Sequence, residues 1–239
     1  HGTRLYPLTL GVSKQLLPVY DKPMVFYPMS VLMRSGISEI LIISKPEDLS
    51  RFKNLFNDGK NYGIKVYYKE QKKPNGIAES LKIAANFIGN DDICLILGDN
   101  IFHGENFLSK LEIAKRNLKK NKATVFGVTV NNPSDFGVIQ YNEEGSIINI
   151  TEKPKSTTSN LIVSGLYFYT NEALTFTKKI KPSKRGELEI TDINNMFLKN
   201  NNLELIKLNS SDFWSDTGTY SSLLIASKYL QEYEKKTGK

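Results

Sequence analysis

Short apolar runs alternate with amphipathic stretches along the first half of this chain. Buried strands are predicted for four runs rich in isoleucine and valine: SEILIIS at 38–44, IKVYYKE at 64–70, DICLILGD at 92–99 and ATVFGVTV at 123–130. Apolar residues at helical spacing between them predict helices at 21–36, 76–89 and 106–121. Such alternation is typical of right-handed βαβ units, in which helices cover both faces of a mainly parallel sheet.

The first of these helices has recognisable ends and one irregular position. Asp21 is placed to cap it, Pro23 falls in its first turn and Gly36 follows its end. Because proline lacks a backbone N–H and its ring clashes with the preceding turn, Pro28 predicts a kink.

The pattern changes beyond about residue 135. FGVIQYNEEGSIINITEKP at 136–154 and NLIVSGLYFYT at 160–170 look like strands joined by tight turns such as Glu144-Gly145. This texture predicts an antiparallel or mixed region. Further helices are predicted at about 171–180, 189–199 and 219–235. Since no repeat or linker interrupts the chain, we expect its two halves to share one sheet.

The composition fits a globular protein that binds anions. The 239 residues are 40% hydrophobic and 24% charged, as in average soluble domains. No run reaches the roughly 18 apolar residues of a membrane span and no signal peptide opens the chain, so we expect a cytoplasmic protein. The net charge of +7 favours nucleic acid or small phosphates as partners. Cys94, the single cysteine, lies in a predicted buried strand, where an inert thiol is expected.

Two acidic residues stand where a ligand can bind. Asp99 in LILGDNIF follows a buried strand, and open α/β sheets bind ligands at the carboxyl ends of their strands. Asp216 in FWSDTGTY precedes the last predicted helix. Mg²⁺ is bound by few carboxylates together with substrate phosphates, so the pair predicts a magnesium site. Capping of a turn or of a helix is the alternative for each carboxylate.

The opening stretch, HGTRLYPLTLGVSKQLLPVYDKP, sets two cations among prolines. Gly2 next to Thr3 can present backbone N–H groups to phosphate oxygens, Arg4 adds a bidentate fork and Lys14 adds a mobile point charge. A loop of this kind is suited to a polyphosphate. It is not a P-loop, because the GK[ST] ending is absent.

Nine segments, in this order, resemble the sugar nucleotidylyltransferase family: GTRLYPLT, SKQLLPVYDKPM, EQKKPNGIAES, LGDNIFHG, FGVIQY, ITEKP, SGLYFY, RGELEITD and WSDTG. The resemblance covers nearly the entire chain. It implies a Rossmann-like α/β nucleotidyltransferase fold, with a mixed, mostly parallel central sheet flanked by helices and a small antiparallel sugar-binding region. It also implies a single domain over 1–239, with a nucleotide-binding half at 1–130 and a sugar-phosphate-binding half at 131–239.

The activity implied by the resemblance is transfer of a nucleotidyl group. Deoxythymidine triphosphate (dTTP) and glucose 1-phosphate would give dTDP-glucose and pyrophosphate by an in-line displacement assisted by Mg²⁺. The family suggests a homo-oligomer, either a tetramer or a dimer, that serves surface polysaccharide synthesis through the dTDP-rhamnose pathway. Neither nucleic acid nor a membrane is an implied partner.

The resemblance also assigns roles to matching positions. The residues that it implies for the nucleotide are Gly2, Thr3, Arg4, Lys14, Gln15, Gln71, Pro74, Gly76 and Asp99. Those for the sugar phosphate are Gly137, Glu152, Lys153, Val163, Gly165, Tyr167 and Arg185. The implied catalytic residues are Arg4, Lys14, Lys153 and Arg185, and the implied metal ligands are Asp99 and Asp216.

Within these sets, Gln71 and Gly76 would meet the base, and Glu152 would accept hydrogen bonds from sugar hydroxyls. Lys153 and Arg185 would clasp the sugar phosphate. An exposed ion pair is the alternative for the Glu152-Lys153 dipeptide.

Three other functions stay open at this point. The same chemistry with uridine or cytidine triphosphate is the nearest, because no local motif reads the ribose. A regulator that binds nucleotide sugars without turnover is disfavoured, since it would need neither the metal ligands nor the leaving-group cations. Nucleic-acid binding rests on charge alone, because the lysine-rich segments at 114–122 and 233–239 lack interleaved aromatic platforms.

The sequence departs from the family pattern in three places. A strand and a glycine pair are expected ahead of GTRL, where this sequence has only His1. We therefore expect the first central strand to precede residue 1 in the native protein. The sequence ends at YEKKTGK without the helical tail of longer relatives, so an effector site built from that tail is expected to be missing. Asn75 stands where relatives often carry aspartate, and either residue suits a turn.

Overall fold

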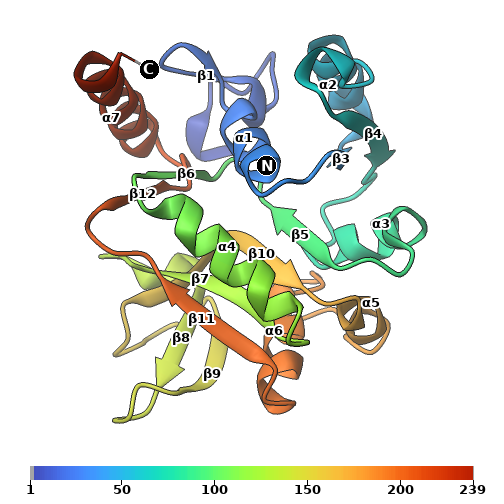
Figure 1. Cartoon of the computed structure of the whole chain (residues 1–239), viewed down its shortest axis with the longest axis vertical. Coiled ribbons are helices and arrows are strands. Elements are labelled where there is room, and N and C mark those ends of the chain that lie inside the picture. Colours follow the sequence, from blue (N-terminus) through green and yellow to red (C-terminus); the bar gives the residue numbers. More distant parts are fainter. Residues whose placement is uncertain (1–2, 239) are drawn as a thin grey trace.

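The structure is a computed structural model that describes residues 3–238. In this part of the chain the α-helices are α1 Phe26–Arg34, α2 Pro46–Phe56, α3 Glu79–Ile88, α4 Phe107–Leu118, α5 Glu172–Thr177, α6 Ile190–Lys199 and α7 Tyr220–Thr237. The strands are β1 Pro18–Val19, β2 Lys22–Pro23, β3 Glu39–Ser44, β4 Lys65–Glu70, β5 Ile93–Ile96, β6 Ile101–Gly104, β7 Ala123–Thr129, β8 Gly137–Tyr141, β9 Ile147–Glu152, β10 Leu161–Tyr169, β11 Leu203–Lys207 and β12 Asp212–Ser215. Short 3₁₀ turns occupy Thr3–Leu5, Lys14–Leu16, Lys60–Tyr62 and Pro133–Asp135. Helices flank the sheets, which is the α/β class that the sequence predicts (Figure 1).

The largest sheet contains strands from both halves of the sequence. Its order is β11-β7-β10-β8-β9, and β5 also pairs with β10 (Figure 1). Parallel pairing occurs between β11 and β7 and, in a separate two-stranded sheet, between β3 and β4. The other pairs of the large sheet are antiparallel. The mixed sheet is therefore present as expected, but the prediction that it is mostly parallel is wrong for the described residues, where most pairs of the large sheet are antiparallel.

Connection length explains the balance of strand directions. Parallel neighbours need a crossover of about a dozen residues or more, which α2 supplies between β3 and β4. The links that precede and follow β8 and β9 are short and hold no α-helix, so these strands turn back on one another. In the β8–β9 hairpin the Asn142 side chain accepts a hydrogen bond from Ser146 N at 2.8 Å.

Helix α1 begins later than the sequence predicts. β1 and β2 form a small antiparallel ladder, and Asp21 lies in the turn between them beside Lys22 instead of capping the helix. The helix starts at Phe26, so Pro28 is its third residue. Because the first four N–H groups of a helix have no intrahelical acceptor, this proline removes no helical hydrogen bond and the predicted kink is not required.

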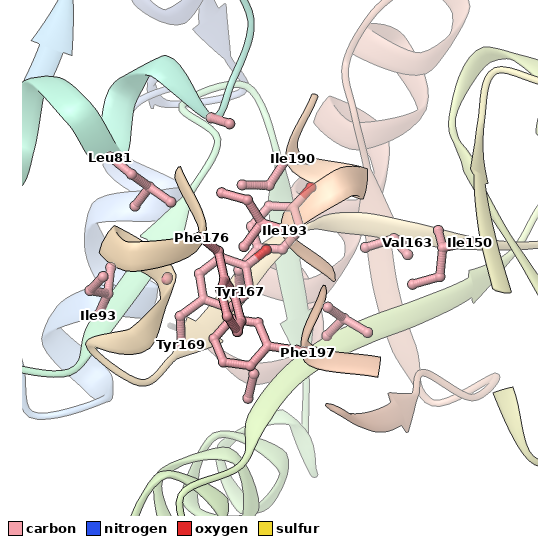
Figure 2. Close-up of a cluster of buried hydrophobic side chains, with 14 of the residues drawn as sticks. Leu81, Ile93, Ile150, Val163, Tyr167, Tyr169, Phe176, Ile190, Ile193 and Phe197 are labelled. Carbon is pink, nitrogen blue, oxygen red and sulfur yellow. The ribbon is translucent and has the colours of Figure 1, made fainter. Parts of the chain in front are cut away.

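The main core fixes β10 against the helices that follow it. Figure 2 shows Tyr167, Tyr169, Phe176 and Phe197 gathered in one cluster. The Tyr169 and Phe197 rings are nearly parallel with centroids 5.4 Å apart, and Phe176 packs edge-on against Phe197 at 4.8 Å. β10 is buried along its whole length. These rings hold β10 and α6 in a fixed relation, and both elements carry residues of the site described below.

Strands β3 and β5 are not paired with each other. An apolar cavity of about 120 Å³ lies between them, lined by Ile40, Leu95 and residues of α1 and α3 such as Leu32 and Leu81. The first central strand expected from the family pattern lies outside the described residues.

Two smaller expectations concern reactivity and membranes. Burial raises the pKa of the Cys94 thiol, which agrees with the inert role predicted for it. Within residues 3–238, no helix combines the length and the apolar character needed to cross a membrane.

Candidate functional site

A polar cavity of about 250 Å³ collects most of the candidate residues. The loops after β5 and β12 contribute to it, as do β8, β9, β10 and the start of α6. The predicted residues that line it are Arg4, Asp99, Gly137, Glu152, Lys153, Val163, Gly165, Tyr167, Arg185 and Asp216. Residues implied for both substrates therefore share one cavity.

Asp99 and Asp216 come from distant parts of the sequence and meet at Lys14. The Lys14 Nζ lies 2.7 Å from Asp99 Oδ2 and 2.9 Å from the backbone oxygen of Asp216. Only 11% of the Lys14 side chain is exposed, so solvent and salt screen this ion pair weakly. One shielded cation thus joins the two loops that carry the predicted metal ligands.

Thr217 makes the second connection between these loops. Its Oγ1 donates a 2.7 Å hydrogen bond to the backbone oxygen of Asp99, and the residue is fully buried. Its φ of 44° lies in the left-handed region, which β-branched residues rarely adopt. Strained backbone of this kind is held in place by its surroundings and clusters at functional sites.

Capping of α7 does not account for Asp216. The N-cap is Thr219, which forms a capping box with Ser222. Asp216 Oδ1 accepts a hydrogen bond from Gly218 N at 3.0 Å, while its Oδ2 lies 3.8 Å from the Arg4 guanidinium. The carboxylate is therefore directed toward the cavity rather than toward the helix.

Asn100 ties the Asp99 loop to β10 and β12. Its buried Oδ1 accepts hydrogen bonds from Trp214 Nε1 at 2.8 Å and from Gly165 N at 3.1 Å, and its Nδ2 donates to Asp99 Oδ1 at 3.0 Å. A Cβ on residue 165 would lie 2.7 Å from the Asn100 amide. Glycine at 165 is thus required for this close approach.

The N-terminal segment places its two cations differently. The Arg4 side chain is 56% exposed, and its guanidinium lies 3.2 Å from Asp135 Oδ2. The Gln15 side chain lies against Gly98: a Cβ on residue 98 would lie 3.1 Å from it. Thr3 begins the 3₁₀ turn that carries Arg4, and Gly2 lies outside the described residues.

The residues implied for the base do not themselves line the cavity. Gln71 follows β4, exposed Pro74 lies in the next loop, and Ile77, one residue beyond Gly76, lines the cavity. Gly76 has a φ of 102°, and a Cβ there would lie 2.3 Å from the backbone oxygen of Leu188. This turn therefore admits only glycine and packs tightly against residue 188.

Arg185 is surrounded by carboxylates. Its Nη2 lies 2.8 Å from Glu187 Oε2, 3.1 Å from Glu189 Oε2 and 3.8 Å from Glu152 Oε1. Lys153 lines the same cavity with a φ of 40°, and its ammonium forms no ion pair with any residue in 3–238. The structure thus brings Lys153 and Arg185 to one end of the cavity, with the lysine free to bind an anion.

Glu152 lies on β9 opposite Gly137 of β8. Burial raises the pKa of Glu152, while a hydrogen bond from Thr191 and the positive charge of Arg185 oppose the shift. A Cβ on residue 137 would lie 3.0 Å from Thr191 Oγ1, so the glycine leaves room for this bond. A partly desolvated carboxylate is suited to accepting hydrogen bonds from sugar hydroxyls.

The charge balance bears on whether a metal fits. Six carboxylates line the cavity, against three lining cations and the nearby Lys14. A phosphate substrate therefore needs additional positive charge. Asp99 and Asp216 line the same cavity and carry hard oxygen donors of the kind that Mg²⁺ prefers, and substrate phosphates would complete its ligands. Among the described residues no group of three or more His, Cys, Asp or Glu could hold a metal.

Several residues of the cavity were not predicted as site residues: Asn100, Asp135, Thr191, Asn194 and Trp214. Trp214 is the single tryptophan of the chain and stands within the WSDTG segment, so the motif pointed to it. No motif or pattern in the sequence pointed to Asn194. Its Nδ2 is buried with no partner in the part of the chain that the structure describes, while Tyr169 donates to its Oδ1 at 2.6 Å.

Comparison with known proteins extends over the whole chain. The sequence profile of the nucleotidyl transferase family matches residues 1–233. The glucose-1-phosphate thymidylyltransferase of Neisseria meningitidis is 50% identical over 230 residues, which are 96% of this chain and 79% of that protein. The enzyme of the same name from Xanthomonas campestris is 46% identical over 237 residues, 99% of this chain and 80% of that protein.

Solved structures show the same likeness. A Bacillus anthracis protein assigned as a glucose-1-phosphate thymidylyltransferase, solved with sucrose, has a TM-score of 0.87 and 36% identity over 97% of this chain and 92% of that chain. A UDP-glucose pyrophosphorylase complexed with UDP-glucose has a TM-score of 0.81 and 25% identity over 97% of this chain and 95% of that chain.

Proposed function

Since this chain belongs to the nucleotidyl transferase family, we propose that it is a glucose-1-phosphate thymidylyltransferase. It transfers a thymidylyl group from dTTP to α-D-glucose 1-phosphate and releases dTDP-glucose and pyrophosphate. The observation that carries the proposal is the shared cavity. Asp99 and Asp216, whose loops Lys14 joins, line the same cavity as Glu152, Lys153 and Arg185. The relatives that match nearly the whole chain carry this enzyme's name.

The reaction is an in-line attack of a phosphate oxygen of glucose 1-phosphate on the α-phosphorus of dTTP. The new oxygen–phosphorus bond forms as the bond from the α-phosphorus to the bridging oxygen breaks, and its electron pair leaves with pyrophosphate. The attacking phosphate is already ionised, so no general base is needed. The chain therefore works by positioning and charge neutralisation.

Four cations divide this work. Arg4 and Lys14 bind the triphosphate and stabilise the departing pyrophosphate, which requires Lys14 to exchange its contact with Asp99 for phosphate oxygens. Lys153 and Arg185 hold the attacking phosphate, and Glu152 accepts hydrogen bonds from the sugar.

Asp99 and Asp216 would hold Mg²⁺, which when bound supplies positive charge at the α-phosphate. The family resemblance supports a cytoplasmic homo-oligomer, tetramer or dimer, that supplies sugar nucleotide for surface polysaccharide. It also supports a single domain with the nucleotide bound by 1–130 and the sugar phosphate by 131–239. The other residues implied by the motifs contact the same two substrates. Those for the nucleotide are Gly2, Thr3, Gln15, Gln71, Pro74 and Gly76, and those for the sugar phosphate are Gly137, Val163, Gly165 and Tyr167.

The same chemistry with uridine triphosphate is the second candidate. It is favoured by the likeness to UDP-glucose pyrophosphorylase, and thymine and uracil present the same hydrogen-bonding edge.

Pyrophosphate release tests both candidates. dTTP, UTP, dCTP and dGTP are each paired with glucose 1-phosphate, galactose 1-phosphate and mannose 1-phosphate, with Mg²⁺ present, and products are identified by mass spectrometry. We expect the highest kcat/KM with dTTP and glucose 1-phosphate, and little turnover of the purine nucleotide. A higher kcat/KM with UTP would establish the second candidate. A folded protein that turns over none of these pairs would contradict both.

A further inference from the structure

The side-chain amide of Gln71 is held in one orientation. Its Nε2 lies 2.8 Å from Glu79 Oε2 and 3.2 Å from the backbone oxygen of Gly76. A carboxylate and a peptide carbonyl can only accept hydrogen bonds, so the nitrogen of the amide, and not its oxygen, must face them. Both amide hydrogens are then in use. Within residues 3–238 no group donates to Gln71 Oε1, which is left as an acceptor.

The carboxylate that orients this amide is itself fixed. Asn75 Nδ2 donates to Glu79 Oε1 at 2.7 Å, so each oxygen of Glu79 has its own amide partner. Glu79 is also the first residue of α3, where the helix dipole favours a negative charge. The side chains of Gln71, Glu79 and Asn75 thus form a hydrogen-bonded chain in which the donor and the acceptor of each bond are determined.

The turn that contains Asn75 is held in place by its contacts with Leu188. Leu188 N donates to the Asn75 backbone oxygen at 2.7 Å, and Ala78 N donates to the Leu188 backbone oxygen at 3.2 Å. Gly76 lies against Leu188 with no space for a Cβ. The position of Gln71 Oε1 relative to the backbone groups of the turn is therefore fixed.

We propose that Glu79 is a positioning residue that makes this site accept thymine or uracil and reject cytosine. The inference rests on the proposed function, in which Gln71 meets the base. Gln71 Oε1 pairs with the N3–H of thymine or uracil. Cytosine presents an unprotonated N3 at that place, so two acceptors would face each other unpaired. The amino group of cytosine lies further along the ring edge. The turn that contains Asn75 is held by Leu188 and does not shift to reach this group.

Glu79→Gln tests this directly. An amide at position 79 can donate as well as accept, so only the 3.2 Å bond to the Gly76 backbone oxygen then favours the original orientation of Gln71. The flipped amide, which presents Nε2–H to cytosine N3, becomes less costly. In the unchanged protein we expect kcat/KM for dTTP to exceed that for dCTP by roughly 100-fold or more. In Glu79→Gln the ratio should narrow by about tenfold. The ratio of dTTP to dUTP should stay unchanged, because both bases offer the same edge; a general loss of structure would not produce this split.

Glu172→Gln is the matched control. Glu172 is the first residue of α5, exposed and outside the cavity lining, so the variant removes the same charge from the same helical position. It should keep the original ratio of dTTP to dCTP. An unchanged ratio in Glu79→Gln, or an equal change in Glu172→Gln, would overturn the proposal.

Two further measurements separate this inference from the proposed function. Calorimetric binding of dTTP and dCTP gives the same ratio without turnover, so it tests Glu79 even if no pyrophosphate is released. In the unchanged protein, 3-methyl-dTTP, which lacks the N3–H, should bind as poorly as dCTP. Binding of 3-methyl-dTTP as tight as that of dTTP would contradict the role of Gln71 Oε1 even if Glu79→Gln fails to fold.

Discussion

The two ends of the cavity position their charged groups in different ways. At one end, hydrogen bonds from Asn100 and Thr217 fix the Asp99 loop beside the Lys14–Asp99 ion pair, and only 11% of the Lys14 side chain is exposed. At the other end, Arg185 is 35% exposed and is held by the carboxylates around it. Hydrogen bonds among Asn100, Gly165, Trp214 and Thr217 hold the first end even when Lys14 leaves Asp99 for a phosphate. The second end is held mainly by ion pairs that a phosphate must displace, so changes there should affect binding and local order together.

The largest effect is expected for Asp99→Asn. A neutral amide is a poorer ligand for Mg²⁺ and leaves Lys14 without its acidic partner, so kcat should fall about 100-fold to 1000-fold. The hydrogen bonds of Asn100 with Trp214 and Gly165 persist and keep the fold, but shielded Lys14 loses its charged partner, so the melting temperature should fall modestly. Pyrophosphate release over a range of Mg²⁺ concentrations measures the effect. Asp91→Asn, at the exposed start of the β5 segment, is the control. Unchanged turnover of Asp99→Asn at limiting Mg²⁺ would refute the proposed metal site.

Arg185→Met should have a smaller effect of a different kind. Loss of the guanidinium should raise the KM for glucose 1-phosphate roughly 10-fold to 100-fold and leave the KM for dTTP nearly constant. The melting temperature should also fall, because Glu189 is buried and loses its cationic partner. Steady-state kinetics and calorimetry measure the two effects. Lys184→Met removes an exposed neighbouring charge as a control. Unchanged kcat together with an unchanged KM for glucose 1-phosphate would place Arg185 outside the sugar-phosphate site.

Glu152→Gln should show the smallest effect on stability, with a defined pH dependence. Burial raises the pKa of Glu152 above the usual value of 4.5, so the folded chain binds this proton more tightly than the unfolded chain. The stability contributed by Glu152 is then full below pH 4.5 and is lost as the pH rises through the raised folded pKa. Glutamine does not titrate, so the variant should melt above the unchanged protein at pH 8 and lose that advantage near pH 4.

The activity of the same variant should move in the opposite direction. Since an amide is a weaker acceptor for hydroxyls, the KM for glucose 1-phosphate should rise several-fold. Glu144→Gln, in the exposed β8–β9 turn, should alter neither quantity. If Glu152→Gln melted below the unchanged protein at pH 8, the carboxylate would be stabilising rather than strained by burial.

Strong apolar patterns made much of the fold predictable. The runs that became β3, β4, β5 and β7 were located from their isoleucine and valine content, because buried strands need those residues. Helix α2 and the short strands β6, β11 and β12 were missed. β6 and β12 have four residues each and pair with one another, so tertiary pairing rather than local pattern defines them.

The site was predictable only where motifs stand in the sequence. Asp99 and Asp216 were located by motif, but the buried connections between their loops were not. The left-handed φ of Thr217 and the contact of Asn100 with Gly165 depend on segments that are distant in the sequence and adjacent in the fold, so no local pattern indicates them. Glu79 belongs to the quoted EQKKPNGIAES segment, yet its role depends on which atom of the Gln71 amide faces it.

Binding of each substrate alone, measured by calorimetry in the presence of Mg²⁺, tests the two-ended site most directly. Asp99→Asn should weaken dTTP binding and leave glucose 1-phosphate binding nearly unchanged, and Arg185→Met should do the reverse. We expect this crossed pattern because the two substrates contact different charged groups. Equal weakening of both substrates by both variants would contradict it.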